Sequence, residues 1–327
     1  MTDVLVAGET LIDFLPGSAG RLAEVETFSR RAGGAPANVA VGLARLDADP
    51  LFWTRLGADP FGDFLADTLA DYGVPTDLVT RDTEAKTGLA FVSHDADAER
   101  AFSFYRDGSA DTRLEPGRIG DETLADHDWV HVGGVTLADD PARTATLDLA
   151  ERARRADCTV SFDPNARPEL WDTFDFADSC RTAFGLADVV KATPEDLRAA
   201  GFEGEPADLA RAVCEHGPHT ALITVGGEGA YAHATADAPW TGAETPEDSA
   251  ETPAGIEVSH AGYAVDVVDT TGAGDAFTAG AIAALSDGAA LADALAFANA
   301  VAAVTTTGTG AMTALPTREA VQSFLGS

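Results

Sequence analysis

The chain has very few positively charged residues, and lysine is almost absent. Only Lys86 and Lys191 are lysines, and 54 acidic residues against 21 basic ones give a formal net charge of −33. Such a charge repels nucleic acid and anionic membrane surfaces, so we expect neither as a partner. The excess of acid is typical of a halophilic protein, whose charged surface keeps it dissolved in concentrated salt.

The sequence also has little cysteine and no long apolar run. Its three cysteines, Cys158, Cys180 and Cys214, are widely spaced and odd in number, which suits a reducing cytoplasm better than a disulfide framework. No run of about 18 apolar residues is present, so we expect no membrane-spanning helix. Residues 1–8 lack a basic segment and lead directly into an apolar strand pattern. We therefore expect no signal peptide and a cytoplasmic protein.

What the sequence does contain is a regular alternation of strand and helix patterns from Asp128 onward. With 327 residues, of which 45% are hydrophobic, the chain can bury a large core. Repeated strand–helix units predict an α/β fold with a mainly parallel central sheet and helices on both faces. In such folds ligands bind at the carboxyl ends of the strands. We expect one domain over residues 1–327.

Two segments, residues about 13–32 and 85–111, break this alternation. Within the second segment, two β-like runs flank the acidic turn 94–99, which predicts a hairpin. We expect both segments to form a small β-sheet that projects from the main body as a lid. A third segment, residues about 234–257, is rich in Ala, Thr, Glu, Asp and Pro and is interpreted as an acidic surface insertion.

The stretch Val268–Gly280 has the most specific chemistry. It reads Val-Asp-Thr-Thr-Gly-Ala-Gly-Asp-Ala-Phe-Thr-Ala-Gly, between a predicted strand at Gly262–Val268 and a predicted helix at Asp275–Leu285. Small residues at a helix start let the first amides and the helix dipole bind an anion. Asp275 beside such an anion is well sited to take a proton from an attacking hydroxyl, as phosphoryl transfer requires. The alternative is an ordinary turn in which Asp275 caps the helix.

A second glycine-rich stretch, Gly33–Asn38, precedes a helix of small residues. Pro36 fits the first turn of that helix, and Asn38 would point toward a ligand. The alternative is a tight loop leading into a packing helix. Asp13, an acid among apolar residues, is by itself most simply a surface carboxylate on an amphipathic strand.

These two stretches resemble, in order and spacing, the two signatures of the ribokinase-like (PfkB) carbohydrate kinases. The resemblance covers essentially the whole chain. It implies a ribokinase-like α/β core with a small β-sheet lid. Residues 8–13, 104–106 and 163–171 look most like fructokinases, with 2-keto-3-deoxygluconate kinases next. The resemblance implies an ATP-dependent sugar kinase, and ribokinase, nucleoside kinase or a non-catalytic nucleotide-binding protein are the less favoured alternatives.

The resemblance also implies a role for individual positions. Asp275 would be the base, and the amides of Gly272, Ala273 and Gly274 would stabilise the transferring phosphate. The substrate would be held by Asp13, Gly34, Asn38, Phe104, Arg106 and Arg167. The ATP site would be lined by Asn165, Lys191, Thr224, Gly226, Gly227, Gly229 and Asn299. For Lys191 the alternative is a surface lysine, and for Arg167 a structural ion pair.

Metal sites are implied in the same way. Asp269 and Thr271 match positions that hold a monovalent cation in family members, and we expect K⁺ there in this chain; Mg²⁺ is expected with ATP. The family's Asn-x-x-Glu element appears here as Thr193–Asp196, so Asp196 would serve the Mg²⁺ network one methylene short of the family's glutamate. A homodimer formed through the lid is implied by the resemblance alone.

Overall fold

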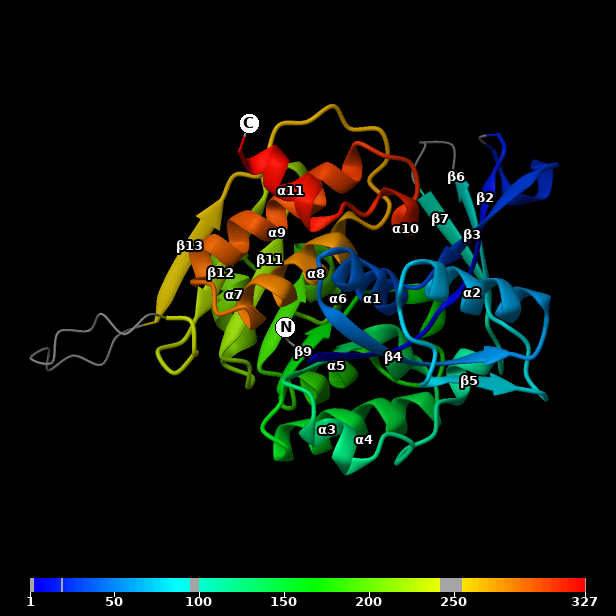
Figure 1. The fold of residues 1–327 in the computed structure, drawn as a ribbon, viewed down its shortest axis with the longest axis horizontal. Helices are drawn as coiled ribbons and strands as arrows, with labels where there is room; N and C mark the ends of the chain where they lie inside the picture. The colour runs from blue at the N-terminus through cyan, green and yellow to red at the C-terminus, as the bar shows by residue number, and fades with distance from the viewer. Residues whose placement is uncertain (1–2, 19, 95–99, 242–254, 327) are drawn as a thin grey trace, which may run out of the picture.

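Two sheets make up the protein (Figure 1). The computed structural model describes residues 3–18, 20–94, 100–241 and 255–326. A nine-stranded sheet forms the body, with helices on both of its faces, and a four-stranded sheet stands beside it. The predicted fold class, a mainly parallel sheet with helices plus a small second sheet, is confirmed.

The large sheet is parallel except at one edge. Its strands lie in the order β13 (Ile256–His260), β12 (Ala230–Ala234), β11 (Thr220–Thr224), β10 (Val189–Ala192), β9 (Thr159–Asp163), β8 (Trp129–Gly133), β1 (Asp3–Ala7), β4 (Asp49–Gly57) and β5 (Val79–Asp82). Strand β12 pairs antiparallel with both β11 and β13, and the other neighbouring strands pair parallel. The carboxyl ends of β8 to β11 therefore meet along one edge, as the sequence predicts.

Helices cover the two faces of this sheet because strand residues alternate between them. Along β1, Val4 and Val6 pack into one apolar cluster, whereas Leu5 and Ala7 pack into the other. The first cluster contains α1 (Ala35–Arg45), α8 (Ala273–Ser286), α9 (Leu291–Thr306), α10 (Ala311–Ala314) and α11 (Arg318–Leu325). The second contains α3 (Asp121–Ala125), α4 (Ala142–Arg155), α5 (Phe176–Phe184), α6 (Pro194–Ala199) and α7 (Pro206–Cys214).

The small sheet has the order β3 (Phe28–Gly33), β2 (Leu11–Pro16), β6 (Leu89–His94) and β7 (Arg100–Tyr105). Strands β6 and β7 form the predicted hairpin, and its turn at residues 95–99 lies outside the described residues. One face packs on α2 (Pro60–Asp71), where the rings of Phe14 and Phe61 meet edge to face at 5.8 Å. The opposite face carries Asp13, which lies within electrostatic reach of Arg167 and Asp275.

Two sequence-based boundaries need correction. The segment Gly262–Val268, predicted as a strand, is an extended loop that follows β13. Its alternating apolar residues do not pair in a sheet; Tyr263 packs on Phe324, and Val268 stays 63% exposed. The predicted insertion 234–257 begins and ends inside the paired strands β12 and β13, and most of its centre, residues 242–254, lies outside the described residues.

Candidate active site

The turn before α8 brings an acid and a helix N-terminus together. Gly272 adopts a left-handed conformation with φ 78°, and a Cβ atom on it would lie 2.8 Å from the Cβ of Ala311. Only glycine fits that turn comfortably. The first amides of α8 follow, and Gly272, the residue at the N-cap, has no side chain to cap them. The amide of Ala273 makes a long bond of 3.3 Å to the carbonyl of Thr270. This end of the helix is built to face an anion.

Asn38 and Asp275 join the two glycine-rich stretches directly. Nδ2 of Asn38 donates a hydrogen bond to Oδ2 of Asp275 at 2.6 Å. Oδ1 of Asn38 is buried and accepts no hydrogen bond within the described part of the chain. Gly34, which precedes α1, has φ 105°, and a Cβ atom there would lie 2.5 Å from the carbonyl oxygen of Glu9. The turn therefore needs glycine, and Asn38 faces the site as predicted.

Two carboxylates with raised pKa values lie at this site. Burial raises the pKa of Asp275 to about 6, although the hydrogen bond from Asn38 and the charge of Lys191 oppose the rise. Burial raises the pKa of Asp13 to about 7; Arg167 opposes that rise, and the charge of Asp275 adds to it. Asp13 is thus a partly buried carboxylate rather than a fully solvated one. It lies against Gly33, where a Cβ atom would collide with its side chain.

The two predicted substrate arginines are placed differently. Arg106 is 4% exposed, and its Nε donates to Oδ2 of Asp111, which also accepts a hydrogen bond from Ser109. Arg167 lies over the ring of Phe102, with its guanidinium carbon 5.4 Å from the ring centre, and is only partly buried. Arg167 lies within electrostatic reach of Asp13 and Asp275, whereas Arg106 is held in an internal ion pair. Phe104, also partly buried, stacks on Phe102.

Lys191 lies in the interior. It is 7% exposed, and its Nζ donates to Oδ2 of Asp163 at 2.9 Å. Burial lowers the pKa of Lys191, but attraction by Asp163 and Asp196 outweighs it, so the pKa lies above the ordinary value. The alternative of a surface lysine is wrong. A Cβ atom on Gly274 would lie 3.1 Å from this ammonium, which places Lys191 directly behind the turn.

A cavity of about 290 Å³ is bordered by residues of the same turn. Five of the seven residues predicted to line ATP border it: Thr224, Gly226, Gly227, Gly229 and Asn299. Ala273 and Gly274 border it too, as do apolar residues that the sequence did not single out, among them Tyr263, Val265, Val267, Phe277 and Ala302. Tyr263, Val265 and Val267 belong to the apolar alternation at Gly262–Val268, which predicts a strand instead of a cavity wall.

The other two predicted ATP residues do not line this cavity. Asn165 has a left-handed φ of 43°, and its amide donates to Oδ1 of Asp163 at 3.1 Å. Lys191 lies behind Gly274 and likewise is not among the lining residues. For both positions, direct contact with the nucleotide stays a prediction.

The predicted metal positions form hydrogen bonds within the protein. Oδ2 of Asp196 accepts bonds from the amide and hydroxyl of Thr193, a capping box at the start of α6, and Oδ1 accepts from the amide of Ala166 at 2.8 Å. Asp269 accepts bonds from Thr271 and from the amide of Gly310. No group of three or more His, Cys, Asp or Glu side chains suited to a metal occurs among the described residues.

Three acids near the site were missed from the sequence as functional candidates: Glu9, Asp111 and Asp163. Glu9 is 3% exposed, and its Oε2 has no hydrogen-bond partner in the described part of the chain. Burial raises the pKa of Glu9 to about 7, against the attraction of Arg106. Their positions in the sequence could have identified two of them, because Glu9 and Asp163 each lie at the carboxyl end of an apolar strand, where ligands bind in this type of fold.

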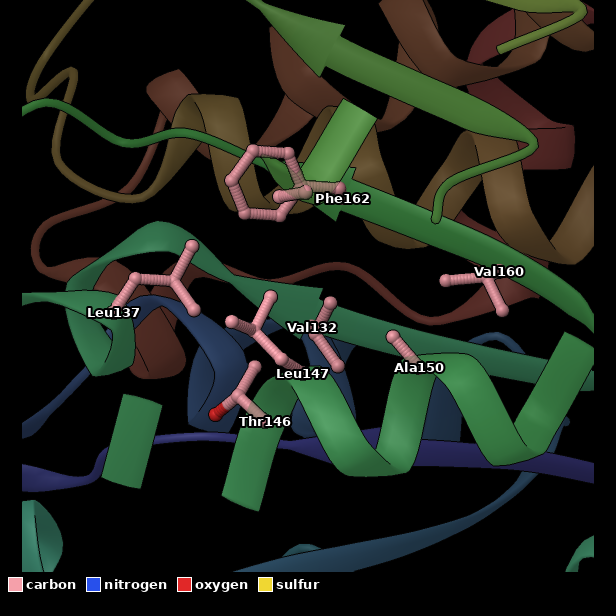
Figure 2. A pocket seen from close by; sticks show the side chains of 8 residues that line it. Val132, Leu137, Thr146, Leu147, Ala150, Val160 and Phe162 are labelled. Carbon is pink, nitrogen blue, oxygen red and sulfur yellow. The ribbon is translucent and has the colours of Figure 1, made fainter. Parts of the chain in front are cut away.

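A second void lies away from these groups, between α4 and strands β8 and β9 (Figure 2). Its volume is about 10 Å³, and side chains such as Val132, Leu147 and Phe162 point into it. A space of this size holds at most one water molecule and suits no substrate.

None of the helices in the described ranges combines the length and the apolar character that a membrane span requires.

Comparison with known proteins agrees with this geometry. Residues 1–318 match the family model described as pfkB family carbohydrate kinase. Fructokinase from Klebsiella pneumoniae is 37% identical over 331 residues, covering 98% of this chain and 99% of that protein.

Two solved structures are similar along their whole length. Fructokinase from Xylella fastidiosa with bound ATP has a TM-score of 0.85 and 31% identity, covering 99% of this chain and 98% of that one. A fructokinase double mutant from Vibrio cholerae O395, bound to fructose, ADP and potassium ion, has a TM-score of 0.80 and 32% identity, with coverage of 99% and 98%. The chain belongs to the pfkB family of carbohydrate kinases.

Proposed function

We propose that this carbohydrate kinase transfers the γ-phosphate of ATP to a hydroxyl of D-fructose. The observation that carries the proposal is the placement of one short turn. Gly274 borders the cavity, while the next residue, Asp275, faces Asn38 and lies within electrostatic reach of Asp13. A nucleotide in the cavity and a sugar beside Asn38 would meet at this turn. The relatives' printed names supply fructose as the acceptor.

Asp275 would act as the base. As the sugar hydroxyl attacks the γ-phosphorus, its proton passes to the Asp275 carboxylate, the new O–P bond forms, and the bond to the leaving ADP oxygen breaks. The amides of Gly272, Ala273 and Gly274 would offset the charge on the phosphoryl oxygens. The long bond of Ala273 to Thr270 is weak enough to exchange for a phosphate oxygen.

The sugar would lie between the small sheet and α1. Oδ1 of Asn38, buried without a partner among the described residues, is a ready acceptor for a sugar hydroxyl. Asp13 and the backbone at Gly34 would hold further hydroxyls, with Phe104 closing from the small sheet. Arg106 would act from its place in the ion pair with Asp111. Water excluded by that closure protects ATP from hydrolysis.

The residues present fit ATP. The cavity is close to the small end of small-molecule sites, which span about 300–1,000 Å³. Its glycines let a ligand approach the backbone: Gly229 has φ 87°, and a Cβ atom there would collide with the carbonyl of His260. Apolar side chains such as Tyr263 and Phe277 suit a purine ring, and Thr224 and Asn299 offer polar contacts.

Mg²⁺ fits this site as an ion bound together with ATP, through the phosphates of the nucleotide. The described residues offer no cluster of three metal-binding side chains, and Asp196 is engaged in the capping box. Mg²⁺ is commonly held by substrate phosphates, water and one or two carboxylates, and when bound it would neutralise phosphate charge. For K⁺ the carboxylate of Asp269 and the Thr271 loop are our candidates.

One rival acceptor is supported by a specific feature. The carboxylate of 2-keto-3-deoxygluconate needs an arginine, and Arg167 is partly exposed beside Asp13 and Asp275. Arg106, the other candidate, already pairs with Asp111. Two free arginines would favour the acid sugar, whereas one arginine that already acts on the charges of two carboxylates favours a neutral sugar.

The test is an ADP-release screen in molar KCl with Mg²⁺. Purified protein is offered fructose, 2-keto-3-deoxygluconate, ribose and nucleosides at several concentrations, and kcat/KM is compared. We expect the highest kcat/KM with fructose. A higher value with the keto-deoxy acid would establish the rival acceptor, and no turnover with any acceptor would contradict a catalytic role.

A further inference from the structure

The ion pair between Lys191 and Asp163 lies directly behind the catalytic turn. The two side chains come from adjacent strands, β10 and β9, and are 7% and 5% exposed. The space beside the Lys191 ammonium is so narrow that a Cβ atom on Gly274 would lie 3.1 Å from it. Among the described residues, Gly274 borders the nucleotide cavity and Lys191 does not. The ammonium therefore lies against the backbone of the turn without lining the cavity.

Stability is a poor explanation for this pair. Burying two charges costs as much as their attraction returns in many proteins, and well-packed apolar residues often serve as well. The residue type is also unusual here, because all but two of the 21 basic residues are arginine, and the other lysine, Lys86, is exposed. A slim ammonium fits against the glycine backbone, where a planar guanidinium needs more room.

The pair lies within electrostatic reach of Asp275. The groups that act on Asp275 are Asn38 from α1, Lys191 from β10, Asp163 from β9 and Arg167 from the loop after β9. Asp13 from β2 and Glu9 from the β1–β2 connection sense its charge in turn. Lys191 opposes the rise that burial imposes on the pKa of Asp275, whereas Asp163 adds to that rise.

Lys191 has its own neighbours. Asp163 and Asp196 attract it, and burial together with Lys191 lowers the pKa of His131 to about 3, so His131 is neutral throughout the useful pH range. Because His131 on β8 is neutral and Asp163 on β9 is an acid, the positive charge near the turn comes from Lys191 on β10. Arg167 approaches Asp275 from the loop beyond β9.

We propose that Lys191 and Asp163 are positioning residues for phosphoryl transfer: Asp163 fixes the Lys191 ammonium behind Gly274, and this ammonium holds the Asp275 carboxylate ready to receive the hydroxyl proton. The proposal rests on the proposed function, because it assigns Asp275 as the base. Lys191 itself neither gains nor loses a proton in the reaction. Its opposite-charge partner sets where the ammonium lies.

The test compares Lys191→Met, Asp163→Asn and the double variant with the parent, and Lys86→Met is the matched control. For each protein, kcat is measured from pH 5 to pH 9 at saturating ATP and sugar, and ATP affinity is measured by titration. Removing the ammonium raises the pKa of Asp275, so the acid limb of Lys191→Met moves up by about one pH unit. Asp163→Asn moves it down, and the double variant lies between them. Lys86→Met leaves the profile unchanged.

Folding is monitored by circular dichroism and thermal melts in molar KCl, because each single variant leaves one buried charge unpaired. The double variant leaves none, so if Lys191→Met does not fold, the shift between Asp163→Asn and the double variant gives the answer. ATP affinity is expected to stay within about threefold, because Lys191 does not line the cavity. Coincident pH profiles, or a loss of ATP affinity beyond tenfold in Lys191→Met, would overturn the proposal.

Measurements on the parent protein distinguish a failure of the proposed function from a failure of the positioning role. If it turns over another sugar instead of fructose, the proposed acceptor fails, and the same pH comparison is made with that sugar. If the parent is active but its folded variants keep its pH profile, the positioning role fails and the proposed function stands.

Discussion

Nδ2 of Asn38 lies 2.6 Å from Oδ2 of Asp275 and donates a hydrogen bond to it, although 237 positions separate the two residues. The contact exists because α1 and α8 pack against each other in the same apolar cluster. It fixes the orientation of the Asp275 carboxylate and leaves Oδ1 of Asn38 for another donor. One amide side chain thus connects the proposed base with the proposed sugar site.

Replacing Asp275 with Asn should remove most of the activity. We expect kcat to fall by about 10²–10⁴-fold, the usual contribution of a positioned acid or base, while ATP affinity changes little. Asp287→Asn, at the exposed far end of the same helix, is the matched control. Coupled ADP-release kinetics and nucleotide titration measure both effects. Turnover of Asp275→Asn within fivefold of the parent would show that Asp275 is not the base.

The pH profile of the parent should reveal the raised pKa of Asp275. Because a base must be ionised to accept a proton, we expect kcat/KM to fall as the pH drops through about 6, well above the ordinary range of aspartate. Asn38→Ala removes a hydrogen bond that stabilises the ionised form, so its acid limb should move to higher pH.

Asn38→Ala should also raise KM for the sugar, because the acceptor Oδ1 is lost. Asn38→Asp is the informative companion, since it keeps an acceptor but places a second carboxylate beside Asp275. Its acid limb should move further up than that of Asn38→Ala. An acid limb that lies at the same pH in all three proteins would contradict the role of the Asn38 hydrogen bond.

Glu9→Gln should stabilise the protein at alkaline pH. The folded-state pKa of Glu9, about 7, lies above the ordinary value of 4.5, so the folded protein binds more protons than the unfolded chain between these values. The free energy of unfolding contributed by Glu9 therefore falls as the pH rises from about 4.5 through 7. Gln cannot ionise and avoids this loss, on the order of 1–3 kcal/mol above pH 8.

The measurement is chemical unfolding of Glu9→Gln and the parent at pH 5 and pH 8 in the same KCl concentration. The advantage of the variant should be larger at pH 8 than at pH 5. Glu319→Gln, on the surface of α11, controls for the loss of one negative charge. A stability difference that is equal at both pH values would contradict the raised pKa.

Salt should stabilise the fold strongly. A net charge of −33 repels itself at low ionic strength, and concentrated cations screen it. We expect the melting temperature to rise by at least about 10 °C between 50 mM and 2 M KCl. For domains of about 150–250 residues, 1 kcal/mol of stability shifts the melting temperature by about 2–4 °C. The same series in choline chloride separates general screening from specific uptake of K⁺. A melting temperature that stays flat in both salts would contradict adaptation of this surface to high salt.

Local patterns were enough to predict most of the framework. The alternation of strands and helices after Asp128 predicted the parallel sheet, because each strand–helix unit has its own apolar period. The hairpin of β6 and β7 and the helix start at Thr193 were likewise local signals. The strand at Gly262–Val268 failed because apolar alternation reports a half-buried surface, and here that surface is the wall of a cavity.

The sequence by itself determined the chemistry: the glycine turns, the acid at Asp275 and the amide at Asn38 are residue types with few other uses in that order. Tertiary structure decided which charges face one another. Whether Lys191 was a surface lysine, whether Arg106 reached outward, and whether Glu9 mattered depended on burial and on the charged groups that the fold brings to each side chain. A charge is tuned by its distance to other charges and to water, and the fold alone sets those distances.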